Sequence, residues 1–380
     1  MNMQMPSDAQ RLAVESFRTF LASEVAPIVR VFRDRAIPRE TLREITQGIA
    51  EFGLPGASLA QEHGGMGLSA VTEAMLFEEL CAVSVDIAQC VLTNLGAAAL
   101  LAELPEARAG LRERYLPLLL AGRSFAGLCV GAAQGSADGG ATAKGDLEGF
   151  VVRGEQGGVA NGHYSDFLIT RVRLDSGAFH HLLIDRAEHG YASRLVERSS
   201  LGGACSALVT FGELRLPAGQ LVWEEDDGAD HRARLLERLQ AGAGLLAVGL
   251  MRAALESSIV AAQDCSAGAR PAGAQPLVAV RLAEMATQLD AARLMCLRAY
   301  SMMDAGVRCQ MQAAMAQWFA MDMLVKACRE TVQLHGGMGP ARPLEVERLV
   351  RGALLLPVPD GTADRHKLMI ARELTGISAL

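Results

Sequence analysis

The chain has 380 residues, a net charge of −7, 50% hydrophobic residues and only 4% aromatic residues. Charges of both signs are mixed along the sequence, which argues against nucleic acid as the main partner. No apolar run reaches the roughly 20 residues that a membrane-spanning helix needs, so no membrane span is predicted.

The N-terminal residues, the cysteines and the histidines further limit the class of protein. The first residues, MNMQMPSDAQR, lack the basic start and apolar centre of a secretory signal. The eight cysteines include no C-x-x-C pair, which is typical of reduced thiols in a cytoplasm. The eight histidines form no cluster with ligand spacing, so we predict no metal site.

The first third of the chain has helical periodicity. Apolar residues recur at three- and four-residue steps over 8–22 and predict an amphipathic helix. A second helix is predicted over 41–52. A glycine-rich loop then leads into a helix that begins near Ser69. We assign residues 1–123 to an N-terminal helical domain.

The pattern changes to that of strands in residues 124–224. Short apolar runs, partly β-branched, are separated by Gly, Asp and Asn, which is typical of a small antiparallel β region. Helical periodicity returns in residues 225–380. Long apolar-striped segments there predict the helices of an antiparallel bundle, over 234–262, 276–305 and 311–334.

Four stretches carry a resemblance to a known family. The first is GLPGASLAQEHGGMG, a glycine loop that precedes the helix near Ser69, and the second is LRERYLPLLLAGR, which ends the first domain. Near the C-terminus, QLHGGMG is followed 21 residues after Gly339 by Asp360 in the run DGT. Together these stretches resemble the acyl-CoA dehydrogenase superfamily, where the last two motifs read Q-x-H-G-G-x-G and E-G-T.

The resemblance implies a fold and an activity. The fold would be α+β and mainly α, with an N-terminal helical domain, a middle antiparallel β domain and a C-terminal four-helix bundle. The activity would be FAD-dependent oxidation of an acyl thioester to the trans-2-enoyl thioester. Because the α-proton of a thioester is weakly acidic, that reaction needs a desolvated carboxylate as its base.

Two carboxylates could be the base. Glu237 lies in LLERLQAGAGLLAVGLM, which is similar to the helix that carries the base in isovaleryl- and long-chain-type members. Asp360 aligns with the Glu of E-G-T, one methylene shorter, and a nitroalkane oxidase branch of the superfamily uses Asp there. Each also has an ordinary explanation, since a Glu-Arg pair on a helix and a turn carboxylate are both common at protein surfaces. We place Glu237 ahead of Asp360.

The expected flavin contacts are kept unevenly. In GLCVGAAQGSADG, Cys129 stands where the family's flavin loop has Thr, and the aromatic residue that shields the flavin is missing unless Tyr164 or Phe167 replaces it. Contacts that the family makes to the partner subunit's flavin are better kept, because Arg270 and the glycine loop could hold a diphosphate. The cofactor contacts expected from the resemblance are Cys129, Ser136, Arg270, Gln333, Gly336, Gly337, Gly339 and Thr362.

This unevenness favours a shared site. The chain is predicted to form a dimer or an α2β2 tetramer with a homologous acyl-CoA dehydrogenase subunit, and to act on an acyl-CoA or acyl-carrier thioester. An electron-transfer flavoprotein or similar protein would accept the electrons. Assemblies of this kind are often linked to steroid side-chain oxidation, so a bulky ring-bearing CoA ester is one expected substrate.

Other hypotheses stay open. The chain could be a flavin-poor, nitroalkane-oxidase-like or monooxygenase-like member of the fold, which Asp360 favours, or an acyl-carrier-protein-linked dehydrogenase. It could also be a non-catalytic structural partner, in which both candidate carboxylates are solvated.

Overall fold

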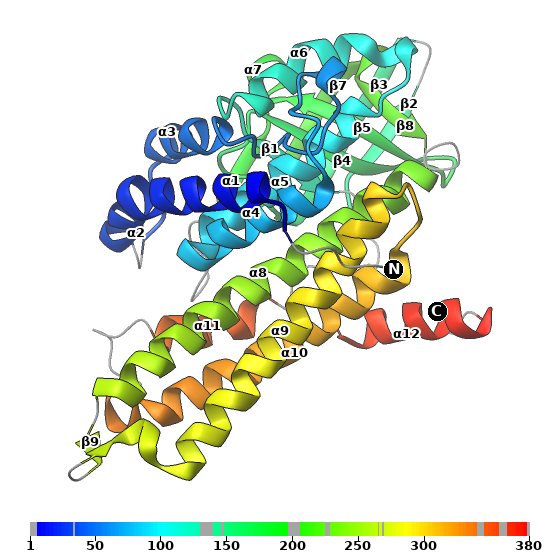
Figure 1. The fold of residues 1–380 in the computed structure, drawn as a ribbon. Helices are drawn as coiled ribbons and strands as arrows, with labels where there is room; N and C mark the ends of the chain where they lie inside the picture. The colour runs from blue at the N-terminus through cyan, green and yellow to red at the C-terminus, as the bar shows by residue number, and fades with distance from the viewer. Residues whose placement is uncertain are drawn as a thin grey trace.

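Figure 1 shows the computed structural model of the chain, which describes residues 6–32, 35–129, 140–145, 148–196, 206–224, 229–264, 266–267, 270–339, 346–356 and 363–377. Helices come first, strands follow, and helices return to the end of the described chain. The predicted α+β class, with helices predominating, is therefore confirmed.

The N-terminal helices begin with an amphipathic segment that a capping box at Ser7 starts and that buries Phe17. A π-helical turn at Leu21–Val25 carries the helix on beyond its predicted end. The prediction near Ser69 is confirmed, since its hydroxyl accepts the Thr72 N–H at 3.1 Å and caps α4. The elements are α1 (Asp8–Phe20), η1 (Leu21–Val25), α2 (Ala26–Val31), α3 (Arg39–Ala50), η2 (Gln61–His63), α4 (Ala70–Val83), α5 (Val85–Ala102), η3 (Glu106–Arg108) and α6 (Ala109–Leu120).

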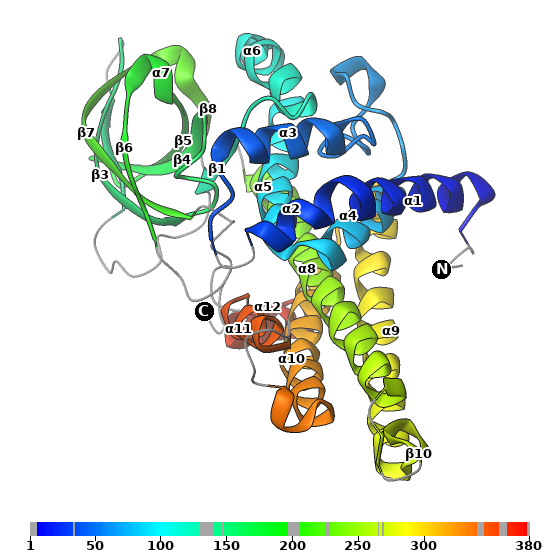
Figure 2. The same ribbon diagram turned by 90° about the vertical axis from the view of Figure 1, so that its left-hand side faces the viewer.

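The middle strands form one eight-stranded sheet within the described residues, in the order β6–β7–β3–β2–β4–β5–β8, with β1 beside β4. Strands β1 and β2 both run parallel to β4, so the sheet is mixed where we expected antiparallel pairs alone. It curves into a barrel-like shape (Figure 2). The elements are β1 (Ala126–Cys129), β2 (Thr142–Gly145), β3 (Gly149–Val159), β4 (Phe167–Leu174), β5 (Phe179–Asp185), α7 (Arg186–His189), β6 (Ala192–Leu195), β7 (Ala207–Pro217), η5 (Ala218–Gln220) and β8 (Leu221–Glu224).

The C-terminal region is a bundle of long helices, and its three predicted segments are confirmed as α8, α9 and α10. Helices α11 and α12 both contact α10. A short hairpin, β9–β10, connects α8 to α9 at the far end of the bundle (Figure 1). The elements are α8 (Ala229–Asp264), β9 (Ser266–Ala267), β10 (Arg270–Pro271), η6 (Ala272–Ala274), α9 (Pro276–Asp304), α10 (Gln310–Leu334), η7 (Gly336–Met338), α11 (Val346–Leu355) and α12 (Ala363–Thr375).

Helix α8 is the axis of the helical packing, because it contacts α4, α5, α9 and α10. Two of its glycines permit this close approach. A Cβ atom at Gly242 would lie 2.3 Å from Leu92 of α5, and one at Gly249 would lie 2.4 Å from Cys81 of α4. A side chain at Gly249 would push α4 away from α8, because the nearest atoms include the α4 backbone, whereas one at Gly242 would displace the Leu92 side chain.

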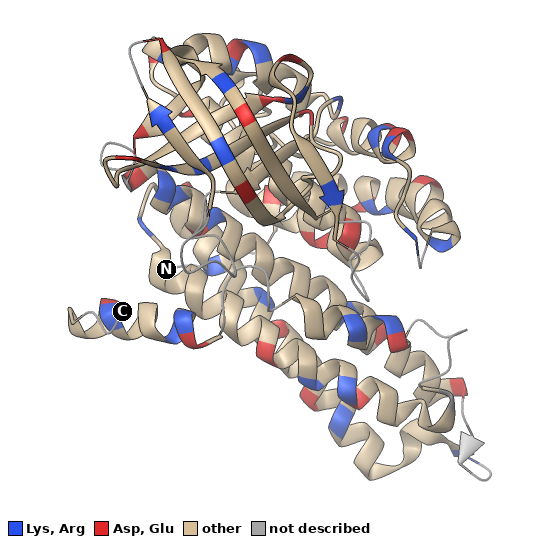
Figure 3. Cartoon of the chain, turned by 180° about the vertical axis from the view of Figure 1, so that it is seen from behind, with Lys and Arg blue, Asp and Glu red and all other residues tan. Residues whose placement is uncertain are grey.

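Two described helices, α5 and α8, are long and apolar enough to cross a membrane by length and composition alone. The share of residues buried inside the protein is 89% in α5 and 61% in the apolar stretch of α8, so packing accounts for their apolar character. Charged residues of both signs are interspersed along the helices and the sheet (Figure 3), in keeping with the mixed charges of the sequence.

Candidate active site

Glu237, on the third turn of α8, is a buried carboxylate with only 3% of its surface exposed. Its Oε1 atom lies 2.7 Å from both Nε and Nη2 of Arg308, in the turn between α9 and α10. Its Oε2 atom has longer contacts, 3.3 Å to the backbone N of Cys309 and 3.5 Å to the Sγ atom of the same residue. The carboxylate therefore lies at the N-terminus of α10, where helix N–H groups favour negative charge.

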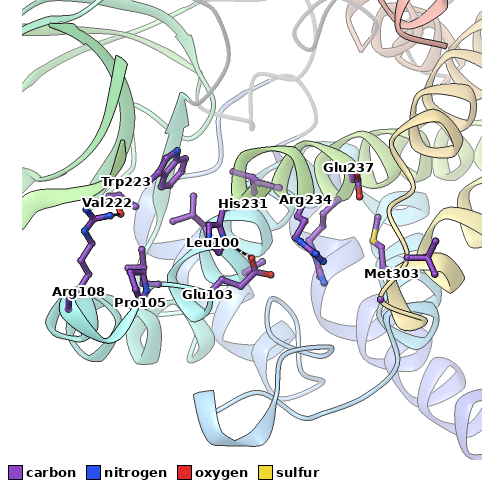
Figure 4. Close-up of a pocket in the computed structure, with 17 residues that line it drawn as sticks. Leu100, Glu103, Pro105, Arg108, Val222, Trp223, His231, Arg234, Glu237 and Met303 are labelled. Atoms are coloured by element: carbon purple, nitrogen blue, oxygen red, sulfur yellow. Dashed lines mark hydrogen bonds and ion pairs between the residues drawn. The ribbon is translucent and has the colours of Figure 1, made fainter. Parts of the chain in front are cut away.

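Glu237 lines a cavity of about 340 Å³ at the junction of the helical and β regions. Figure 4 shows Glu237 and Met303 at one end of the cavity and Arg108 and Trp223 at the other. Apolar side chains from α5, the segment after it, β8, α8, α9 and the α9–α10 turn form much of the wall. These side chains are Ala99, Leu100, Leu104, Val222, Trp223, Leu235, Met303 and Val307. The cavity falls at the small end of the range for ligand sites, about 300–1,000 Å³.

The charged side chains on the cavity wall are paired within the protein. His231 Nδ1 lies 3.2 Å from Glu103, and Arg234 donates to Asp230 at 2.8 Å. The Arg108 guanidinium donates to the carbonyl of Val222. Arg238 donates at 2.6 Å to Glu73, a fully buried carboxylate of α4, and at 3.0 Å to the Ser58 hydroxyl. These pairs fix the shape of the wall around the carboxylate of Glu237.

The part of the flavin loop that the structure describes ends at Cys129, the last residue of β1. Its sulfur accepts a hydrogen bond from the Gln156 side chain, and burial raises the pKa of the thiol to about 11. Cys129 is therefore a neutral thiol at physiological pH. Ser136, Asp360 and Thr362, which the sequence also singles out, lie outside the described residues.

Neither aromatic substitute for the flavin shield is free for that role. The Tyr164 hydroxyl donates to the Ile37 carbonyl at 2.8 Å, and the ring packs against the helical core. Phe167 is only 1% exposed and packs against the Tyr115 ring, with centroids 4.8 Å apart. Both rings stabilise the contact between the helices and the sheet.

The other expected cofactor contacts lie at the far end of the bundle, and all but Gly339 are exposed. Gln333, Gly336 and Gly337 are exposed, and a Cβ atom at either glycine would meet no atom within 4 Å. Gly339, by contrast, is buried against the Val332 backbone. Arg270 lies exposed in the hairpin that follows α8.

The structure brings these two motifs to the same end of α8. His335, beside the glycines, lies 3.2 Å from the Ser257 hydroxyl, and a Cβ atom at Gly273, in the turn after Arg270, would lie 3.3 Å from the Ala262 carbonyl. Open glycine backbone and an exposed guanidinium fit the diphosphate of a flavin dinucleotide. This end lies about 30 Å from Glu237, since 20 residues of helix separate Glu237 from Ser257 at about 1.5 Å each.

Two features of the site were missed by the sequence reasoning. Arg308 follows an ordinary glycine turn, and the contact with Glu237 joins residues 71 positions apart, so no local pattern could indicate it. The cavity is likewise formed by elements from all three regions of the chain.

These features define a helical and β chain with a buried carboxylate on the wall of a cavity between its helical and β regions. Residues 7–123 match the model of the acyl-CoA dehydrogenase N-terminal domain, and residues 227–375 match that of the acyl-CoA dehydrogenase C-terminal domain. The chain belongs to the acyl-CoA dehydrogenase family, whose members are oxidoreductases that act on CH–CH groups.

Similar proteins support this assignment. A probable acyl-CoA dehydrogenase, YngJ, from Bacillus subtilis is 26% identical, over 98% of this chain and 100% of its own length. The solved butyryl-CoA dehydrogenase from Megasphaera elsdenii has a TM-score of 0.90 at 20% identity, covering 98% of this chain and 100% of that one. A glutaryl-CoA dehydrogenase from Mycobacterium smegmatis in complex with FADH2 has a TM-score of 0.89 at 20% identity, covering 99% and 96%. At these identities the solved structures show the fold.

Proposed function

We propose that the chain is an FAD-dependent dehydrogenase that converts an acyl thioester to its trans-2-enoyl form. The observation that carries this proposal is the buried carboxylate of Glu237 on the wall of the cavity, in a chain of this family. Glu237 takes the α-proton of the thioester, and the C–H bond electrons become part of the new double bond. When bound, FAD would supply the acceptor for the hydride that leaves the β-carbon.

The chain's own residues supply a base and hold it in place. The Glu237 side chain is buried, and Arg308 and the Cys309 N–H fix its carboxylate at the cavity wall. A positioned carboxylate of this kind can take a proton from a bound substrate as a general base. The proposed cofactor contacts remain Cys129 and Ser136 near the ring, Thr362, and the group at the far end of the bundle, where Arg270, Gln333, Gly336 and Gly337 are exposed and Gly339 is buried.

We infer that the flavin site is shared between two chains. The base and the diphosphate contacts lie about 30 Å apart along α8, because each residue of the helix advances it by about 1.5 Å. The short ribityl chain that joins a flavin ring to its diphosphate cannot cover that length. Arg270 and the glycine loop would then hold a cofactor whose ring belongs to a partner chain, either a second copy or a homologous subunit.

The partners and the compartment follow from the same proposal. We expect an acyl-CoA or acyl-carrier thioester as substrate. The CoA ester of a steroid side chain is the bulky substrate that we would test. An electron-transfer flavoprotein or a similar protein would take the electrons away. The described cysteines are free thiols, which suits a reducing compartment such as the cytoplasm.

The base is tested by separate Glu237→Gln and Asp360→Asn substitutions in the FAD-loaded assembly, with enoyl-thioester formation as the measurement. Loss of the Glu237 carboxylate is expected to lower kcat by about 10²–10⁴-fold. Glu284→Gln, an exposed residue of α9, is the matched control. Normal turnover in Glu237→Gln together with loss in Asp360→Asn would assign the base to Asp360. Normal turnover in both variants would mean that this chain does not carry the dehydrogenation chemistry through either carboxylate.

The shared site is tested by colour. If the partner is a homologous subunit, protein expressed alone is expected to be colourless or poorly loaded with flavin, and the flavin absorbance is expected to appear on co-expression with that subunit. If the partner is a second copy, protein expressed alone is expected to be yellow only as an oligomer. A monomeric, fully yellow protein would contradict the shared site.

A further inference from the structure

We propose that Arg308 is a positioning residue that holds one oxygen of the Glu237 carboxylate and leaves the other to receive the substrate proton. This inference rests on the proposed function, because it assigns a role to a neighbour of the proposed base. It names the part of the protein that fixes the orientation of that base.

The two oxygens of Glu237 are held unequally. Oε1 accepts two charge-assisted contacts from the guanidinium, from Nε and Nη2, each at 2.7 Å. An ionised carboxylate offers about two acceptor positions on each oxygen, so Oε1 is filled. Oε2 has only the 3.3 Å contact from the Cys309 backbone and the 3.5 Å contact from its thiol, a weak donor. Both oxygens carry two contacts, but those to Oε2 are longer and weaker, so Oε2 is the oxygen on which an incoming proton more readily displaces a contact.

Arg308 is itself fixed in place. The opposite edge of its guanidinium, Nη1, lies 2.6 Å from Asp230 in the first turn of α8. The turn that carries it is tied down next to it, since the carboxylate of Asp304 accepts the N–H groups of Ala70 and Val71 at the start of α4. Gly306, with φ of 66°, closes the turn. The arginine therefore cannot swing away without breaking its contacts to two carboxylates of α8.

Several other charged groups lie around the carboxylate, and each is paired elsewhere. Arg238 pairs with Glu73, Arg234 with Asp230, and His231 with Glu103. Among the described residues, Arg308 is the cation that contacts Glu237 directly. The titratable and charged groups that line the cavity or contact Glu237 are Glu103, Arg108, His231, Arg234, Arg238, Arg308 and Cys309.

Replacing this cation has a predictable sign. An adjacent positive charge favours the ionised carboxylate, so its removal makes Glu237 take up a proton at higher pH. The acid limb of kcat/KM should then move upward by about one pH unit or more in Arg308→Met. At a pH below the acid limb this variant should lose about tenfold in kcat/KM, while at a pH well above the limb it should approach the unsubstituted enzyme. Arg308→Lys, which keeps the charge, should restore most of the profile.

The experiment measures pH profiles of kcat/KM on the FAD-loaded assembly for the unsubstituted enzyme, Arg308→Met, Arg308→Lys and the control Arg298→Met, an exposed residue of α9. A second readout needs no flavin: ¹³C-carboxyl labelling of glutamate, with the Glu237 signal assigned by its loss in Glu237→Gln. That signal should titrate at higher pH in Arg308→Met. If the acid limb of kcat/KM stays at the same pH in Arg308→Met and the rate falls equally at every pH, Arg308 is only structural and the proposal is overturned.

The outcomes separate this inference from the proposed function. Loss of turnover in Glu237→Gln with an unshifted limb in Arg308→Met leaves the base in place and rejects the role of Arg308. Normal turnover in Glu237→Gln rejects Glu237 as the base and the role of Arg308 with it. No enoyl product from any flavin-loaded assembly rejects the proposed function itself.

Discussion

The two ends of α8 are built in opposite ways. At its start, Glu237 and Arg238 are each paired with a charged side chain from another element, and the carboxylates involved are buried. At its end, Arg270 and the loop at Gly336 are exposed, with open space over the glycine. Buried pairs fix a geometry but are costly to break, whereas exposed donors are hydrated and ready for a ligand. The start of α8 therefore suits a catalytic carboxylate, and the end of α8 suits binding of a ligand from outside the chain.

The largest effect on folding is expected at the buried start of α8. Glu73→Gln would leave Arg238 without its charged partner, in a place where the Glu73 side chain is fully buried. Loss of one member of a buried pair costs about 3–5 kcal/mol in free energy of unfolding. Urea unfolding at pH 7 measures this cost, with Glu284→Gln expected to change the value by less than about 0.5 kcal/mol. A loss below about 1 kcal/mol would mean that the pair contributes little and that the start of α8 is held by apolar packing alone.

Buried pairing along α8 extends as far as Arg252, which contacts Glu79 with two bonds of 2.9 Å. Burial opposes ionisation of Glu79, but hydrogen bonds from Arg18 and Arg252 outweigh it and lower the pKa of the carboxyl to about 2. Because this pKa is lower in the folded state, the carboxylate stabilises the protein above about pH 4.3, its unfolded value. That stability is lost as the pH falls toward 2.

A pair of unfolding curves tests this contribution. At pH 7, Glu79→Gln is expected to be less stable than the unsubstituted protein by of the order of 2 kcal/mol. The difference should shrink between about pH 4.5 and pH 2, because there the unsubstituted protein loses the same charge. Free energies of unfolding from urea titrations at pH 7, 5, 4 and 3 would show it. A difference that stays constant over this range would mean that the two proteins differ by packing and not by charge.

The contrast between the two ends explains what the sequence could and could not predict. Helices α8, α9 and α10 were predictable because their apolar periodicity repeats over many turns. The parallel pairing of β1 and β2 with β4 was not, since it depends on crossovers between strands that are not sequence neighbours.

The same distinction holds for the candidate site. Glu237 and the glycine loop were found through local motifs that resemble a family. The pairing of Glu237 with Arg308, and of Ser257 with His335 near the loop, joins residues 71 and 78 positions apart. Such contacts arise from tertiary packing, which no local pattern encodes.

The smallest effect on folding, and the sharpest test of the exposed end, comes from two adjacent glycines. Gly336 has φ of 57°, a conformation that costs a residue with a Cβ about 1 kcal/mol, whereas Gly337 does not have a positive φ. Gly336→Ala should therefore lower the free energy of unfolding by about 1 kcal/mol and Gly337→Ala by less than about 0.5 kcal/mol. If a diphosphate approaches this backbone closely, both variants should weaken FAD binding in the assembled protein, measured by fluorescence titration of the flavin. Weaker binding in Gly337→Ala without loss of stability would separate ligand capture from folding. Unchanged FAD affinity in both variants would mean that the open space over these glycines is ordinary solvent-exposed surface.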